Sequence, residues 1–420
     1  MVRNTSRRED LHLAVLTVGL GLIVGSSSLL LGLLLDHVEY LFLGFIENNQ
    51  VPVAIHTPPV QRFLALVLGG IISALSWYWL QRNWRPVGIN AAMQGTRMPV
   101  GRTIGHVVTQ IFYVSTGGSI GRELAPRQAG AMIADNLSRW SQQHGWQITP
   151  EDRRLLIAAA AGAGFAGVYI SPLTGTMFCL ELLYKKITPR SVAVSVTMSA
   201  IATMVGALTK GFVPYYLTGN HHYALTIIPL AIILGVVNGA LGAGFKAIIN
   251  RASQHRAYGR QLLWQFPLVA ALTGLIATFF PAVCGNGRGL AQLAMNTHPA
   301  TLLAISWLGF GFLAKASATL LTIKGGGYGG TLTPSIALGA CSGLMIGALY
   351  VPLVSGVTLS QTAVLGAAGL LAASQSAPLM ALFMIYEVCH MNHTALLPLA
   401  LVVAIATWTA QQFQKADCKI

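Results

Sequence analysis

The sequence predicts an all-α protein that crosses a membrane several times. Of its 420 residues, 54% are hydrophobic and 9% are charged, whereas a soluble domain carries about a quarter charged residues. Several apolar runs reach the roughly 20 residues that a helix needs to cross a bilayer. The runs do not alternate apolar and polar residues as transmembrane β-strands do. The predicted spans lie within residues 11–35, 63–80, 192–208, 225–249, 301–321 and 396–408.

The net charge of +14 fits the topology of a membrane protein better than a nucleic-acid partner. Basic residues gather in short segments between the apolar runs, and such segments stay on the cytoplasmic side. By contrast, residues 36–61 carry Asp36, Glu39 and Glu47 without any Lys or Arg. We therefore expect these residues outside, and we expect a multi-pass protein of the inner (plasma) membrane with both termini in the cytoplasm.

The remaining composition predicts no metal site, no cofactor and no enzyme. The five cysteines form no CxxC pair, and the histidines form no close HxxxH or HExxH pattern. An intramembrane enzyme would need such ligands or a nucleophile at membrane depth. The polar tail is short, so we expect residues 1–420 to form a single transmembrane transporter domain without a soluble regulatory domain.

Two motifs occur twice, in the same order. The segment GGSIGRELAP (117–126) matches GGGYGGTLTP (325–334) at an offset of 208, which sets Gly121 opposite Gly329 and Leu124 opposite Leu332. The segment SPLTGTMFCLELLY (171–184) matches APLMALFMIYEVCH (377–390) at an offset of 206. The agreement in order and spacing favours an internal duplication, with repeat 1 at about 11–208 and repeat 2 at about 222–413.

Each glycine-rich motif is expected to begin a broken helix. Glycine permits unwound backbone, and proline suits the first turn of a helix. A helix N-terminus leaves amide N–H groups unpaired and attracts anions. Repeats in transporters place the substrate at their interface, near the bilayer midplane. Two such helix ends would therefore bind an anion mainly through backbone amides. The alternative, a purely structural membrane scaffold, would leave both motifs unexplained.

Glu123 is the candidate gate of this site. A carboxylate at a helix N-terminus can occupy an anion site, or take up a proton and leave it. The alternative is a simple capping carboxylate. Because ionisable residues inside membranes generally serve function, we favour Glu123 as both gate and proton carrier. Arg122 is expected to add positive potential near the site or to bind backbone carbonyls, and Lys315 and Lys324 to add to the same potential.

These segments resemble the motifs of the CLC chloride channel and transporter family. GRELAP resembles the family's Gly-Arg-Glu gate, GGTLTP its second-half Gly-x-Phe-x-Pro motif, SPLTGTMFCLELLY its "PL-x-G…E" helix, and CGNGRG (284–289) its glycine-rich extracellular loop. The resemblance runs from about residue 11 to residue 413. It implies inverted-topology repeats whose broken helices meet at a midplane anion site, a homodimer embedded in membrane lipid, and one anion pathway per subunit.

Several residues depart from the family pattern, and these departures indicate which branch of the family the chain resembles. Val87 and Asn90 in PVGIN stand where the family has serine and proline, and Thr331 and Leu332 stand where an aliphatic residue and phenylalanine are usual. Leu182 follows Glu181, so the inner glutamate of chloride/proton exchangers is absent, and the family's late tyrosine has no match. This pattern resembles the fluoride/proton antiporter branch.

The resemblance assigns gating and proton transfer to Glu123. Fluoride is a small, strong hydrogen-bond acceptor, so it would gain from neutral donors such as the Asn90 amide or the Thr331 hydroxyl. We therefore expect export of fluoride from the cytoplasm in exchange for protons. The alternative is a chloride/proton antiporter or a chloride channel of the same family. The expected anion-binding residues are Val87, Gly88, Asn90, Gly121, Arg122, Gly330, Thr331 and Leu332.

Overall fold

The computed structural model describes residues 2–82, 84–219, 221–297 and 301–417. The domain predicted over residues 1–420 also includes residues 1, 83, 220, 298–300 and 418–420, which lie outside the described residues. The described residues form helices and their connections, with no strand among them. The predicted all-α class is confirmed.

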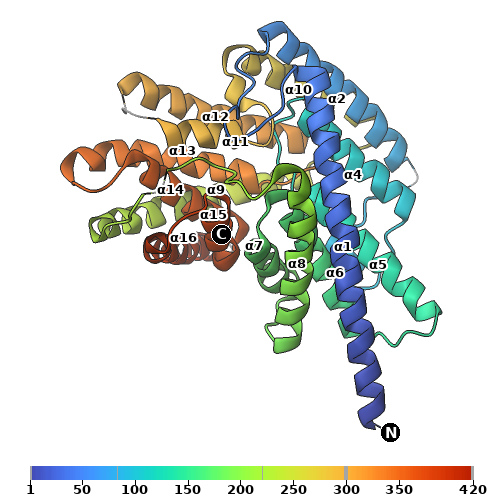
Figure 1. Ribbon diagram of the computed structural model, residues 1–420. Coiled ribbons are helices and arrows are strands. Elements are labelled where there is room, and N and C mark those ends of the chain that lie inside the picture. The colour runs from blue at the N-terminus through green and yellow to red at the C-terminus, as the bar shows by residue number, and fades with distance from the viewer. Residues whose placement is uncertain (1, 83, 220, 298–300, 418–420) are drawn as a thin grey trace. The chain divides into compact units, whose positions relative to one another are not determined.

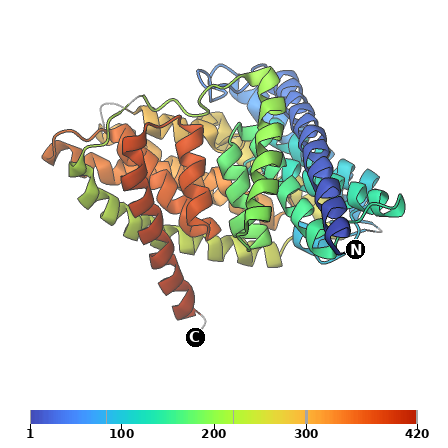
Figure 2. The ribbon, with the colours of Figure 1, turned by 60° about the horizontal axis from the view of Figure 1, so that its bottom comes forward.

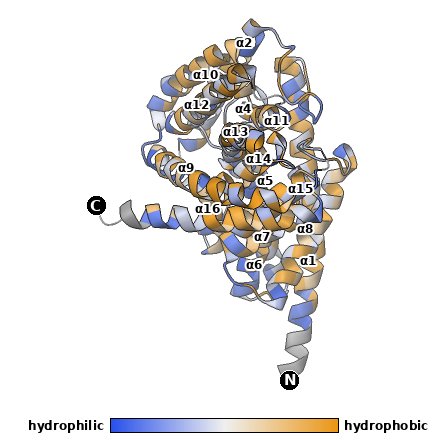
Figure 3. Ribbon diagram, turned by 90° about the vertical axis from the view of Figure 1, so that its left-hand side faces the viewer, coloured by the Kyte–Doolittle hydropathy of each residue, from blue (hydrophilic) through white to orange (hydrophobic). Residues whose placement is uncertain are grey.

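Eight helices of the described residues are long and apolar enough to cross a membrane. They account for all six predicted runs, although the run from 225 begins in the turn η2 and the run from 301 begins at the N-cap of α12. The helices α10 and α13 add two more spans, and Figure 3 shows hydrophobic residues along these helices. Pro267 lies inside α10. The helices are α1 (Val2–Leu43), α2 (Pro59–Gln81), α8 (Pro189–Lys210), α9 (Ile228–Gln254), α10 (Leu262–Phe279), α12 (Leu302–Lys324), α13 (Leu332–Tyr350) and α16 (Leu396–Asp417).

The remaining helices lie between these spans in the chain. They are α3 (Ile89–Met93), α4 (Val100–Ser115), α5 (Leu124–Gln143), α6 (Pro150–Tyr169), α7 (Pro172–Met177), the π-helical η1 (Phe178–Tyr184), α11 (Arg288–Asn296), α14 (Leu359–Gln375) and α15 (Pro378–Val388). Short 3₁₀ turns are η2 (Leu225–Ile227), η3 (Gly259–Gln261), η4 (Pro281–Val283), η5 (Val351–Leu353) and η6 (His393–Ala395).

The helices form two compact units, each built from separate stretches of the chain. Unit 1 contains the residues up to Leu34, Leu80–Ile111 and Glu123–Val213. Unit 2 contains Leu35–Trp79, Phe112–Arg122 and the residues from Pro214 onward. Each glycine-rich motif therefore has its loop in unit 2, whereas the helix that follows the first motif belongs to unit 1.

Small residues bring the helices of unit 1 close together. The helix α6 packs against α5 and α8, and Figure 2 shows the long N-terminal helix α1 beside α8. A Cβ atom added at Gly25 of α1 would lie 2.9 Å from the Cα of Ala202 in α8. A Cβ at Gly164 of α6 would lie 2.2 Å from the carbonyl oxygen of Pro126 in α5. Glycine at these positions permits backbone contact between helices, as is common inside membranes.

Unit 2 is organised around α14, which packs against α9, α13, α15 and α16 (Figure 1). All residues of α14 from Leu359 to Ser374 are buried. Its run of Gly, Ala and Leu leaves room for neighbouring backbones on every side. The corresponding run of Ala and Gly makes α6 the buried helix of unit 1.

The second repeated motif has the same backbone conformation in both halves. The helix α6 ends at Ile170, a left-handed residue with φ of 54°, and α14 ends at Ser376, with φ of 53°. The next residues, Ser171 and Ala377, have φ of −136° and −141° with ψ of 80° in both. The helices α7 and α15 then begin at proline. Neither Ile170 nor Ser376 is a glycine, so repeating this uncommon conformation supports the duplication independently of sequence similarity.

Candidate anion site

The two glycine-rich motifs are joined directly through their backbones. The N–H of Gly121 donates to the carbonyl of Gly330 at 2.7 Å, and the N–H of Gly330 donates to the carbonyl of Gly121 at 2.8 Å. Both residues are buried and belong to unit 2. Three residues after Gly121, α5 begins at Leu124, and two residues after Gly330, α13 begins at Leu332. The predicted helix starts at GRELAP and GGTLTP are confirmed.

The structure corrects the register in which the sequence set these motifs side by side. The left-handed turn before the bridge is made by Gly117, with φ of 100°, and by Gly326, with φ of 110°. The equivalent positions therefore differ by 209, and Gly121 pairs with Gly330 rather than Gly329. Helix starts still differ by 208, so the first motif has one more residue between bridge and helix. Adjacent glycines cannot be told apart in the sequence. The backbone conformation shows which glycine makes the left-handed turn in each motif.

Glu123 occupies the N-cap position of α5 and is fully buried, with 0% of its surface exposed. Its side chain makes no capping hydrogen bond to the helix. Its backbone carbonyl accepts a hydrogen bond from Nε of Arg127 at 2.8 Å. The simple capping role that we considered as an alternative is therefore not what this carboxylate does in the structure.

Thr331 occupies the equivalent N-cap position of α13 and likewise makes no capping bond with its side chain. Its hydroxyl oxygen accepts a hydrogen bond from the side-chain amide of Gln375 at 3.4 Å. Accepting this bond turns the hydroxyl proton away from Gln375, so that it can donate elsewhere. Leu332 follows with 1% of its surface exposed. A neutral side-chain donor thus lies at the start of α13.

The PVGIN segment belongs to unit 1. Gly88 caps the short helix α3, Val87 is half-buried, and Asn90 is exposed at the second position of that helix. The structure brings together the expected site residues of unit 2, which are Gly121, Arg122, Gly330, Thr331 and Leu332. Val87, Gly88, Asn90 and Glu123 are described with unit 1.

Arg122 contacts two side chains of unit 2, and its expected contribution to the local potential stays a prediction. Its guanidinium donates to the hydroxyl of Tyr215 at 3.1 Å and lies 3.5 Å from the carboxylate of Glu47. Burial raises the pKa of Tyr215 to about 12, so its hydroxyl stays protonated at neutral pH. Glu47 and Tyr215 could not be identified from the sequence as neighbours of the motif. The only signal was a cluster of carboxylates in residues 36–61.

Lys315, a residue of α12, binds the loop of the GGSIGRELAP motif. Its side chain is fully buried, at 0% exposed. The ammonium donates to the hydroxyl of Ser119 at 2.9 Å and to the carbonyls of Gly285 at 2.6 Å and Val283 at 3.1 Å. Lys315 therefore ties the GGSIGRELAP loop to the CGNGRG segment. Lys324, by contrast, is exposed at the end of α12.

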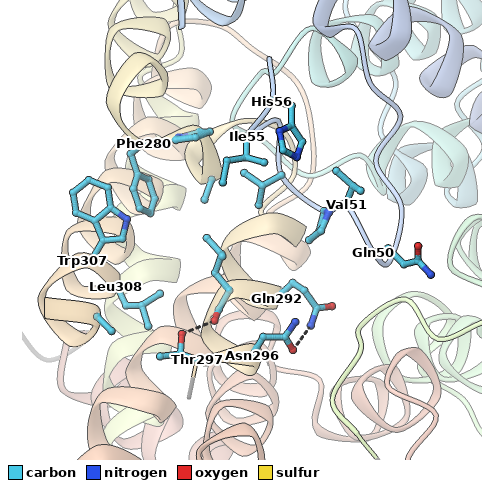
Figure 4. A pocket seen from close by; sticks show the side chains of 16 residues that line it. Gln50, Val51, Ile55, His56, Phe280, Gln292, Asn296, Thr297, Trp307 and Leu308 are labelled. Atoms are coloured by element: carbon cyan, nitrogen blue, oxygen red, sulfur yellow. Dashed lines mark hydrogen bonds between the residues drawn. The ribbon is translucent and has the colours of Figure 1, made fainter. Parts of the chain in front are cut away.

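A separate cavity of about 460 Å³ lies in unit 2 between residues 50–56, α11 and the start of α12 (Figure 4). Figure 4 shows Phe280, Trp307 and Leu308 on one side, with Gln292 and Asn296 joined by a hydrogen bond. Among the described residues, its lining includes no Lys or Arg and none of the predicted site residues. This largely apolar cavity is therefore distinct from the candidate anion site.

The profile of the voltage gated chloride channel family matches residues 69–411 of the chain, over four fifths of its length. The chain belongs to this CLC family. Its similarity to relatives extends over most of both sequences. It is 29% identical over 367 residues to the voltage-gated ClC-type chloride channel ClcB of Escherichia coli K12, covering 83% of this chain and 84% of the relative. It is 28% identical over 396 residues to ClcB of Citrobacter koseri, covering 90% and 91%.

Solved structures confirm the CLC fold. A slow cyanobacterial Cl⁻/H⁺ antiporter superposes with a TM-score of 0.80 at 21% identity, covering 96% of this chain and 95% of its own. A CLC-type fluoride/proton antiporter superposes with a TM-score of 0.73 at 20% identity, covering 94% of each chain. At this identity the likeness establishes the fold alone. The family match over residues 69–411 and the apolar helices make the chain a multi-pass membrane protein of the CLC family, a family of channels and transporters rather than of enzymes.

Proposed function

We propose that this CLC protein is a secondary active transporter that exports fluoride from the cytoplasm as protons enter. The observation that carries the proposal is the Gly121–Gly330 bridge, which is followed on both sides by a helix N-terminus. Amides at such helix ends bind anions without a full opposite charge. Glu123, buried at one of the two N-cap positions, takes up and releases the proton.

Fluoride is favoured by the neutral donors that replace the family's usual residues. Thr331 offers a hydroxyl at the start of α13, and Gln375 lies within 3.4 Å of it. Asn90 offers an amide from PVGIN. These groups join the backbone of Val87, Gly88, Gly121, Gly330 and Leu332 in binding the anion, while Arg122 supplies positive potential. A small anion with a high charge density gains more from such donors than a large halide does.

Chloride is the second candidate, because two comparisons favour it. The curated relatives carry the name of a chloride channel, and the structure with a TM-score of 0.80 is a Cl⁻/H⁺ antiporter. Under either reading we propose a homodimer in the inner membrane with both termini cytoplasmic. The two inverted repeats, at about 11–208 and 222–413, supply one midplane anion site per subunit.

Ion efflux from proteoliposomes tests the proposal, with fluoride, chloride and pH electrodes reading the same vesicles. We expect fluoride efflux accompanied by proton uptake, and we expect Glu123→Gln to abolish that coupled flux. Chloride efflux at an equal rate would overturn the fluoride assignment. Fluoride efflux without proton movement would overturn antiport.

The donor hypothesis has its own test. We expect both Asn90→Ala and Thr331→Val to lower the ratio of fluoride to chloride efflux. Thr331→Ser, which keeps the hydroxyl, is the matched control and should retain the ratio. Unchanged selectivity in Asn90→Ala and Thr331→Val together would refute the role of neutral donors.

A further inference from the structure

A single carboxylate in unit 2 faces two buried arginines. One oxygen of Glu47 lies 3.5 Å from Nη1 of Arg122 and 3.3 Å from Nη1 of Arg288, and it accepts from the hydroxyl of Tyr215 at 3.4 Å. The side chains of Glu47, Arg122 and Arg288 are 9%, 6% and 7% exposed. Glu47, Arg122, Tyr215 and Arg288 form a charge cluster. Arg122 directly precedes Glu123 in the chain.

The cluster is held rigidly by further hydrogen bonds. Arg288 donates to the backbone carbonyl of Tyr215 through Nε at 3.1 Å and Nη2 at 2.7 Å. The carbon of its guanidinium lies 3.9 Å from the centre of the Tyr215 ring. The hydroxyl of Tyr215 also accepts from Asn286 at 2.9 Å. The backbone N–H of Glu47 donates to the carboxylate of Glu39 at 2.6 Å.

The electrostatics explain why a carboxylate is needed at this position. Two guanidinium groups around one tyrosine repel each other, and burial strengthens that repulsion. Glu47 offsets their charge, whereas removing one partner of a buried ion pair leaves an uncompensated charge. A transport pathway must bind its ion weakly enough to release it. An arginine without its counter-charge, beside an anion pathway, would hold the anion too strongly.

We propose that Glu47 is a positioning residue for transport, which holds the guanidinium of Arg122 and offsets its charge so that a passing anion is released. The proposal rests on the anion transport proposed above. It explains how the GRE motif can carry an arginine without trapping the ion. It also gives the segment that connects α1 to α2 a direct role in transport.

The expected signature is a fall in KM together with a fall in kcat. In Glu47→Gln, the released charge of Arg122 binds the anion more tightly and delays its departure. We expect KM and kcat for the transported anion each to fall roughly tenfold, which corresponds to about 1.4 kcal/mol. A merely structural disturbance would lower the amount of folded protein without lowering KM. Glu47→Asp, which keeps the charge, should recover most of both constants.

Unit 1 offers a matched control. Asp135 is also a buried carboxylate between two arginines, Arg139 at 3.1 Å and Arg153, and it accepts from the N–H of Met98 at 3.0 Å. Asp135→Asn should therefore destabilise the protein comparably and leave KM and kcat per folded molecule unchanged. The double variant Glu47→Gln/Arg122→Gln removes both charges and should return KM toward that of the unmodified protein.

The experiment measures efflux of fluoride and chloride from proteoliposomes at several internal concentrations, normalised to folded protein. A lower KM in Glu47→Gln that Arg122→Gln reverses supports the proposal. An unchanged or raised KM in Glu47→Gln overturns it, as does the same KM shift in Asp135→Asn. Absence of anion flux in the unmodified protein would instead overturn the proposed function, so the two failures are distinguishable.

Discussion

The contact between α13 and α14 predicts that Gly366→Ala destabilises the protein. A Cβ atom added at Gly366 would lie 2.3 Å from the carbonyl oxygen of Gly339 and 2.6 Å from the Cα of Gly343. Both neighbours are backbone atoms within a helix, so no side chain can rotate out of the way. The methyl group can be accommodated only by moving two buried helices apart.

The magnitude follows from two opposing terms. Replacing glycine by alanine within a helix stabilises it by about 1 kcal/mol. Overpacking costs about 1–3 kcal/mol, and the backbone contact places this case at about 3. We therefore expect a net loss of about 2 kcal/mol in the free energy of unfolding for Gly366→Ala. The control is Gly244→Ala in α9, where no atom lies within 4 Å of the added Cβ and a gain of up to about 1 kcal/mol is expected.

The assay is equilibrium unfolding in mixed micelles of a mild detergent and SDS, followed by circular dichroism for both variants. The expected difference between them is about 3 kcal/mol, because the helix term is shared and only the contact differs. Equal free energies of unfolding for Gly366→Ala and Gly244→Ala would refute the reasoning. That result would mean that α13 and α14 are not in backbone contact.

Two further predictions concern residues away from the candidate site. Hydrogen bonds from Lys186 and Tyr184 to Glu151 lower the pKa of this exposed carboxyl, so its small stabilising contribution is present above about pH 4.3 and is lost as the pH falls through its folded pKa. Glu151→Gln should therefore melt slightly below the unmodified protein at pH 7, and the two should melt alike once the pH has fallen below the folded pKa of Glu151. A gap that persists at the lowest pH at which the protein stays folded would contradict this origin. At the start of α14, Thr358 and Gln361 form a capping box with bonds of 3.3 and 2.8 Å. Thr358→Ala should cost about 1 kcal/mol in the same unfolding assay, whereas Thr358→Ser should cost far less, and equal losses would argue against the cap.

The parts of the structure that depend on local composition could be predicted from the sequence. Long apolar runs became helices, because hydrophobicity and length decide a membrane span without reference to the rest of the chain. The helix starts at Leu124 and Leu332 could be predicted for the same reason, since glycine and proline act on the backbone nearby.

Contacts between distant segments could not be predicted. Glu47 lies 75 residues before Arg122 and 241 before Arg288. The sequence around each of these residues does not indicate that they are in contact. The register of the glycines was wrong by one for a related reason, because Gly325, Gly326 and Gly327 are chemically identical and only the fold distinguishes them. Lys315 was expected to add positive potential near the site. Its three hydrogen bonds, to Ser119, Val283 and Gly285, could not be predicted because these residues meet only in the folded chain.

The unequal length of the two motifs has a practical consequence for protein engineering. Between bridge and helix the first motif carries Arg122 and Glu123, whereas the second carries Thr331 alone. Exchanging residues one for one cannot make the halves alike, since Thr331→Glu would supply a carboxyl without the arginine before it. Converting the second half to the first would require an arginine inserted after Gly330. That arginine would need a carboxylate beside it, as Arg122 has in Glu47. The two helix starts at the bridge thus differ in chain length as well as in residue type, although both follow the same left-handed glycine turn.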